Sequence, residues 1–152
     1  MESGVLVHLK DLGVASVLGL SALGSCLGVA AAGPAAVGAW KKCLAQGKTA
    51  PFILVVFIGA PLSQTIYGMV VMNSIAAAVG KGIFLWPTGI LAGLAIGVSA
   101  WVQGIIGAAA ADAMAETGKG FGNYLMALGI IETVALFVMV FTLAMSIPKL
   151  VM

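Results

Sequence analysis

The sequence has few charged side chains. Aspartate, glutamate, lysine and arginine make up 8% of its 152 residues, whereas a soluble globular domain averages about 25%. Water is therefore not the main solvent of this chain. The net charge of +2 comes entirely from lysine, and no basic patch is present, so nucleic acid is not an expected partner.

The sequence also lacks the motifs that several kinds of site need. Its two cysteines, Cys26 and Cys43, do not have the spacing of metal ligands, and we expect no disulfide between them. No Gly-rich loop ends in Lys-Ser or Lys-Thr, so the chain has no phosphate-binding motif for a nucleotide. We therefore expect no cofactor, and no ATP hydrolysis by this chain alone.

Long apolar runs are what the sequence has instead. Charged residues occur in clusters, and between them lie four apolar segments at about 12–40, 51–80, 83–111 and 121–148. Each is longer than the roughly 20 residues that a helix needs to cross a bilayer. The sequence thus predicts an all-α, multi-pass protein of the cell membrane, with four transmembrane helices and both termini on one side.

Lysine positions weakly favour one orientation. Four lysines lie in the loops after the first and third segments, and three lie on the other side: Lys41, Lys42, Lys48 and Lys119 against Lys10, Lys81 and Lys149. Because cytoplasmic loops carry an excess of positive side chains, we expect these two loops in the cytoplasm and both termini outside it.

The two halves of the chain resemble each other. A shift of 68 residues, from 64 to 132, places Gln64 on Glu132. A shift of 69 residues, from 24 to 93, aligns three glycines of the first segment with three of the third: Gly24, Gly28 and Gly38 with Gly93, Gly97 and Gly107. We predict a duplicated helical hairpin, with units at 1–82 and 83–152. Small residues let helices approach closely, so the first and third helices are expected as the inner wall of an assembly. Ordinary packing in a four-helix bundle is the alternative.

One carboxylate, Glu132, lies in the middle of the fourth apolar segment. A charged side chain at the centre of a membrane helix costs roughly 2.5–3.5 kcal/mol on insertion scales, and such residues usually mark ion or proton pathways. No lysine lies at the same depth. Glu132 must therefore be protonated or must hold a cation.

Other isolated polar residues fall at the same depth. At about 1.5 Å per helical residue, Gln64, Gln103 and Glu132 each lie roughly 16–20 Å from one membrane surface. That is near the middle of a bilayer about 40–45 Å thick. Ser63 and Tyr67 are close to Gln64 in the second segment, so one polar site from three helices is expected.

The chemistry of these residues suits a hard cation. Pro61 has no N–H to give, so the carbonyl of Phe57, one turn earlier, loses its helical partner. A carboxylate, amide oxygens, a hydroxyl and a freed carbonyl are ligands for an ion such as Na⁺. A proton site would need only Glu132 and an apolar lining. The glutamines would then be hydrogen-bonding links between helices.

On these residues the chain resembles the ion-carrying proteolipid, known as the c or K subunit, of rotary V-type and A-type ATPases. The likeness covers essentially the whole chain, with its duplicated hairpin, glycine-rich odd helices and one carboxylate in the fourth helix. The P-x-x-Q-x-x-Y run at Pro61, Gln64 and Tyr67, together with Gln103, is similar to the bacterial sodium-translocating branch.

The resemblance implies a homo-oligomeric rotor ring, with the first and third helices inside, that carries ions while ATP is hydrolysed or synthesised elsewhere in the complex. It implies Na⁺ (or H⁺) bound by Glu132, Gln103, Gln64, Ser63 and the backbone carbonyl of Ala60, with Tyr67 hydrogen-bonding Glu132. It also implies a stator membrane subunit whose Arg displaces the ion, and central-stalk subunits at loops 41–50 and 112–121.

Two other functions compete with this one. A small proton-coupled secondary transporter acting as a dimer would use Glu132 for coupling, but aromatic residues make up only 7% of the chain, few for an aromatic substrate chamber. A purely structural membrane protein would leave the carboxylate in the apolar segment without a role.

Overall fold

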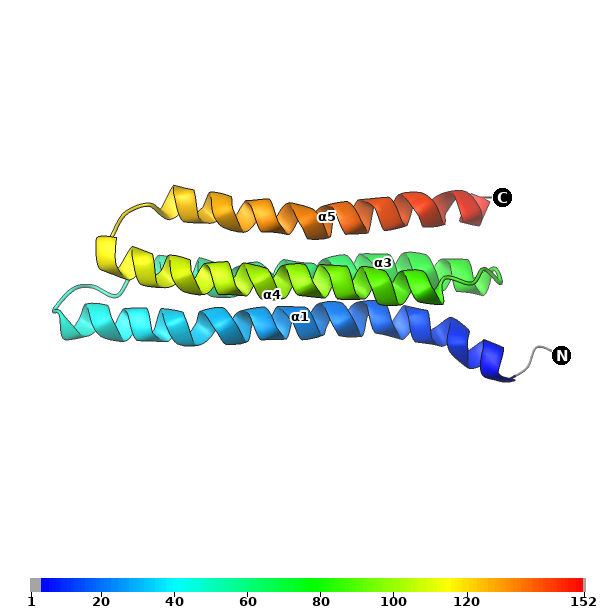
Figure 1. Ribbon diagram of the computed structural model, residues 1–152, viewed down its shortest axis with the longest axis horizontal. Helices are drawn as coiled ribbons and strands as arrows, with labels where there is room; N and C mark the ends of the chain where they lie inside the picture. Colours follow the sequence, from blue (N-terminus) through cyan, green and yellow to red (C-terminus); the bar gives the residue numbers. More distant parts are fainter. Residues whose placement is uncertain (1–3, 152) are drawn as a thin grey trace.

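The protein is an elongated bundle of helices that lie side by side (Figure 1). The computed structural model describes residues 4–151, with the side chains of His8, Leu9 and residues 11–145. The chain forms four long helical rods: α1 (Gly4–Ala45), a second rod of several pieces, α4 (Trp86–Thr117) and α5 (Phe121–Val151). The beginning of α1 and the end of α5 lie at the same end of the bundle.

All four rods are long and apolar enough to cross a membrane, and no strand occurs within residues 4–151. The predicted all-α class with four spans is therefore confirmed. The predicted duplication into 1–82 and 83–152 stays a prediction, and residues 1–3 and 152 of those units lie outside the described part. The side chains of Lys10 and Lys149, used for the orientation, also lie outside it.

The observed helices differ from the predicted apolar segments mainly at their ends. The first runs from Gly4 to Ala45, because charged residues at its ends can continue a helix into the polar zone. The third begins at Trp86, with a proline in its first turn, where a missing N–H costs nothing. It ends at Gly118, whose left-handed φ of 65° closes the helix as its N–H donates to the carbonyl of Met114.

The second rod is interrupted near its middle. A 3₁₀ turn, η1 (Phe52–Leu54), leads into α2 (Val55–Gly59), a second 3₁₀ turn η2 (Ala60–Leu62), and then α3 (Ser63–Gly80). Pro61 lies in η2, and a proline inside a helix removes one backbone hydrogen bond. The break thus lies directly beside Ser63 and Gln64.

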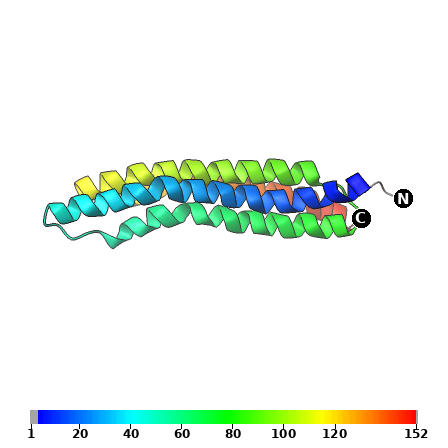
Figure 2. The same ribbon diagram turned by 90° about the horizontal axis from the view of Figure 1, so that it is seen from below.

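Glycines bring α1 and α4 into close backbone contact. A Cβ atom placed on Gly24 would collide with the backbone of Gly97, and one placed on Gly104 would collide with the backbone of Gly28. Helix α1 packs against both α4 and α3, and it lies in front of them in the view of Figure 2. The small residues of α1 and α4 therefore pack against each other within one chain.

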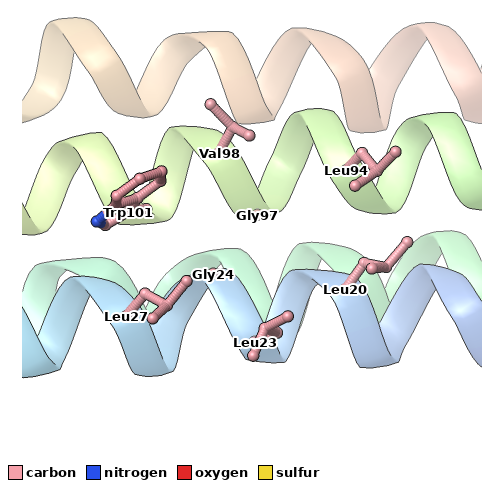
Figure 3. A pocket seen from close by; sticks show the side chains of 8 residues that line it. All are labelled: Leu20, Leu23, Gly24, Leu27, Leu94, Gly97, Val98 and Trp101. Atoms are coloured by element: carbon pink, nitrogen blue, oxygen red, sulfur yellow. The ribbon is translucent and has the colours of Figure 1, made fainter.

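Next to the Gly24–Gly97 contact the surface is hollowed by about 160 Å³ (Figure 3). The hollow is lined by eight residues of α1 and α4: Leu20, Leu23, Gly24, Leu27, Leu94, Gly97, Val98 and Trp101. Its lining is apolar and includes none of the predicted site residues, so this hollow offers no ion chemistry.

Two apolar clusters fill the interior at different levels along the bundle. The loop-side cluster includes Leu54, Phe57 and Leu128, and the terminus-side cluster includes Val71 and Ile96. Along the second rod and α4, the predicted polar residues fall between these two sets. The site therefore occupies a polar layer between two apolar ones.

Candidate functional site

The helix break positions the carbonyl of Ala60 beside the site. The hydroxyl of Ser63 lies 3.0 Å from this carbonyl oxygen, and the N–H of Ser63 also donates to it. The carbonyl of Phe57 lies instead against α4, where a Cβ on Gly107 would be 2.7 Å from its oxygen. The carbonyl of Phe57, which the proline alone predicts to be free, thus packs against the α4 backbone.

A chain of hydrogen bonds joins the second rod to α4. The Ser63 hydroxyl lies 3.1 Å from Oε1 of Gln64, and its single proton can serve this oxygen or the Ala60 carbonyl at one time. Nε2 of Gln64 donates to Oε1 of Gln103 at 2.8 Å. Both glutamine side chains are fully buried, where an unpaired amide would be costly.

The chain of bonds continues from α4 to α5. Nε2 of Gln103 donates to the carbonyl of Leu128 at 3.0 Å and lies 3.5 Å from Oε2 of Glu132. The hydroxyl of Tyr67 donates to Oε1 of Glu132 at 2.7 Å. Glu132 itself is only half-buried. One carboxylate oxygen therefore faces the amide layer, and the other is held by the tyrosine.

The structure thus brings together the side chains that the sequence placed at one depth. Ser63, Gln64, Gln103, Tyr67 and Glu132 form one network from three rods. Within the described side chains this network contains a single carboxylate. Its oxygen atoms are hard ligands of the kind that alkali and alkaline-earth cations prefer.

The sequence did not indicate a further contact, between Ser99 and α5. The Ser99 hydroxyl donates to the carbonyl of Ile131 at 2.9 Å. Ser99 precedes Gln103 by four residues, so both lie on the same face of α4. This i, i+4 spacing before a predicted site residue is the one signal that could have pointed to Ser99.

In the part of α1 whose side chains the structure describes, two serine hydroxyls lie near the layer. Thr65 donates to Oγ of Ser25 at 2.9 Å, and Ser21 donates to the carbonyl of Val17 in its own helix at 2.7 Å. Neither bond reaches Glu132. The first rod therefore supports the second rod without contributing a group to the carboxylate network.

At the loop end an ion pair joins α1 to α4. Nζ of Lys42 lies 2.5 Å from a carboxylate oxygen of Glu116 and 4.0 Å from Asp112. All three side chains are substantially exposed, and exposed pairs contribute little to stability. These acids differ from Glu132 in having a basic partner and contact with water.

The chain matches a known protein family over part of its length. The family of the C subunit of ATP synthase matches residues 88–145, which contain most of α4 and α5 with Gln103 and Glu132. Ser63, Gln64 and Tyr67 lie outside the matched part. No curated protein matches the chain.

The four long apolar helices support a multi-pass membrane protein. The part of the chain that holds Gln103 and Glu132 is thus similar to the C subunit of ATP synthase, a family whose members form rings.

Proposed function

We propose that this chain is the rotor proteolipid of a V/A-type ATPase and carries Na⁺ at Glu132. The observation that carries the proposal is the surroundings of this carboxylate. Oε1 accepts from Tyr67 at 2.7 Å, and Oε2 lies 3.5 Å from a buried glutamine amide. A site for a proton alone would need none of the neighbouring amide and hydroxyl groups.

The proposed ligands are the carboxylate of Glu132, the side-chain oxygens of Gln103, Gln64 and Ser63, and the carbonyl of Ala60. Without an ion these oxygens accept hydrogen bonds from one another's donors. An arriving Na⁺ would replace those donors, and the serine hydroxyl and the glutamine amides would turn their oxygens toward it. One carboxylate then balances one monovalent charge.

Charge balance explains how such a site works during rotation. With Na⁺ bound, Glu132 and the ion form a neutral pair that can face lipid. Without the ion the carboxylate is charged, and exposing it to lipid costs several kcal/mol on the scale of roughly 2.5–3.5 for a membrane-centre charge. An Arg of a stator membrane subunit would release the ion by replacing it as the partner of Glu132.

The proposal includes an assembly and an orientation. Identical copies would form a ring with α1 and α4 inside and the second rod and α5 outside. Loops 41–50 and 112–121 would face the cytoplasm and the central stalk, and both termini would lie outside. The close glycine contacts between α1 and α4 support an inner wall of small residues.

The test is protection of Glu132 from dicyclohexylcarbodiimide, which attacks protonated carboxyls in apolar surroundings. Since Na⁺ needs a deprotonated carboxylate, millimolar Na⁺ should slow labelling, and more strongly as the pH rises. In Gln64→Leu and Gln103→Leu, protection should weaken sharply while labelling persists. If Na⁺ gives no protection in the unmodified protein between about pH 6 and 9, a range chosen around neutrality, the carried ion is H⁺.

A further inference from the structure

We infer that Ser99 is a positioning residue for Glu132, an inference that rests on the proposed ion-carrying role of that carboxylate. The Ser99 hydroxyl holds the turn of α5 from which Glu132 projects. It acts on the backbone of α5 and does not touch the carboxylate.

Two side chains of α4 bind the backbone of α5 at this turn. Ser99 donates to the carbonyl of Ile131 at 2.9 Å, and Gln103 donates to the carbonyl of Leu128 at 3.0 Å. The two donors lie four residues apart on one face of α4, and the two acceptors lie three residues apart on one face of α5. The two hydrogen bonds therefore link the same face of α4 to the same face of α5.

Both acceptors belong to the backbone around Glu132. The Ile131 carbonyl is part of the peptide group that links Ile131 to Glu132. The Leu128 carbonyl accepts the N–H of Glu132 within the α-helix. The two hydrogen bonds thus fix the rotation of α5 about its axis in the turn that leads into Glu132. That rotation decides whether Oε1 comes within 2.7 Å of Tyr67.

The hydrogen bond from Ser99 to Ile131 lies where apolar packing between α4 and α5 is weak. A groove of about 460 Å³ runs between α4 and α5 there, and Ser99 and Ile131 are in its wall. Ser99 itself is 3% exposed, so water does not compete for its hydroxyl. A hydrogen bond at such a place contributes more to the alignment of α5 than one inside a packed core.

Ser21 provides a matched control for this role. It is equally buried, but its hydroxyl bonds the carbonyl of Val17 within its own helix. Ser21→Ala and Ser99→Ala therefore remove the same chemical group, and only the second removes a contact with α5. Ser99→Thr keeps the hydroxyl, at a position that borders the groove of about 460 Å³.

The experiment measures carbodiimide labelling of Glu132 in the assembled protein, first without Na⁺. Ser99→Ala should raise the labelling rate about threefold, because an interhelical hydrogen bond in a membrane contributes roughly 0.6 kcal/mol on average. Ser99→Thr and Ser21→Ala should label like the unmodified protein. In a Na⁺ titration, the half-protecting concentration should rise by a similar factor in Ser99→Ala alone.

Equal labelling rates in Ser99→Ala and Ser21→Ala would overturn the inference. So would a Ser99→Ala protein that fails to assemble while Ser99→Thr assembles, since Ser99 would then be needed for the bundle itself. Absence of Na⁺ protection in every protein, the unmodified one included, would instead remove the sodium proposal. The rates without Na⁺ would still decide the role of Ser99.

Discussion

The hydroxyl of Tyr67 donates a hydrogen bond of 2.7 Å to Oε1 of Glu132 and so joins the second rod to α5. The two residues come from different hairpins of the chain. The bond holds one oxygen of a half-buried carboxylate at the level where Gln64 and Gln103 are fully buried.

Replacing Tyr67 by Phe should open the site. The variant loses the hydroxyl and keeps the ring, so helix packing is preserved. Interhelical hydrogen bonds in membranes contribute about 0.6–1.7 kcal/mol, and labelling of Glu132 by carbodiimide should therefore rise about 3- to 20-fold. Tyr124→Phe is the control, because Tyr124 packs edge-on against Phe57 near the loop end. Equal labelling in the two variants would contradict the closing role of Tyr67.

Replacing Glu132 by Gln should abolish ion transport without preventing assembly. The amide has nearly the same volume and can still accept from Tyr67, but it cannot balance a cation. Uptake of labelled Na⁺ into vesicles containing the reconstituted complex should fall to background. Asp11→Asn, at an exposed position near the terminal end of the bundle, should transport normally. Normal transport by the Glu132 variant would refute the assignment.

Carbodiimide should modify Glu132 in preference to the other acidic side chains. Asp112 and Glu116 are exposed at the loop end, and both lie within 4.0 Å of Lys42, so neither has the apolar surroundings in which the reagent attacks. Mass spectrometry of the labelled protein should place the adduct on the peptide containing Glu132. An adduct found mainly on Asp112 or Glu116 would show that burial does not set the reactivity.

Replacing Gly24 by Ala should disturb the bundle. The added Cβ would collide with the backbone of Gly97, which cannot rotate away as a side chain does. Overpacking of this kind costs about 1–3 kcal/mol, so the variant should unfold at lower temperature in detergent. Gly19→Ala, in the same helix with open space around its Cβ position, should be as stable as the unmodified protein or more so. A reversed order of the two unfolding temperatures would rule out the close contact.

The sequence predicted the helices and most of the network for one physical reason. Polar residues are so rare in these segments that Glu132, Gln103 and Gln64 could be placed by counting the helical rise. The hydrogen bonds between them show that these three residues do lie at the same depth in the bundle. Ion binding by these residues stays a prediction.

The backbone around the site could not be predicted in the same way. Pro61 predicts a freed carbonyl at Phe57, but the direction of that carbonyl depends on Gly107 of another helix. Ala60 was expected only from the family resemblance. Ser99 was missed because a serine in a helix often bonds its own backbone, as Ser21 does, and only the position of α5 distinguishes the two.

The two apolar clusters on either side of the polar layer form a barrier to ions along the length of the bundle. An unpaired ion moved along the bundle would have to cross a region lined by residues such as Phe57 and Leu54 or Val71 and Ile96, and an ion without partners in such surroundings costs tens of kcal/mol. The carboxylate of Glu132 is half-buried, so an ion has a shorter path to it from the side of the bundle, past Tyr67. Under the proposed function, an ion would therefore reach Glu132 from the side of the bundle and not along its length.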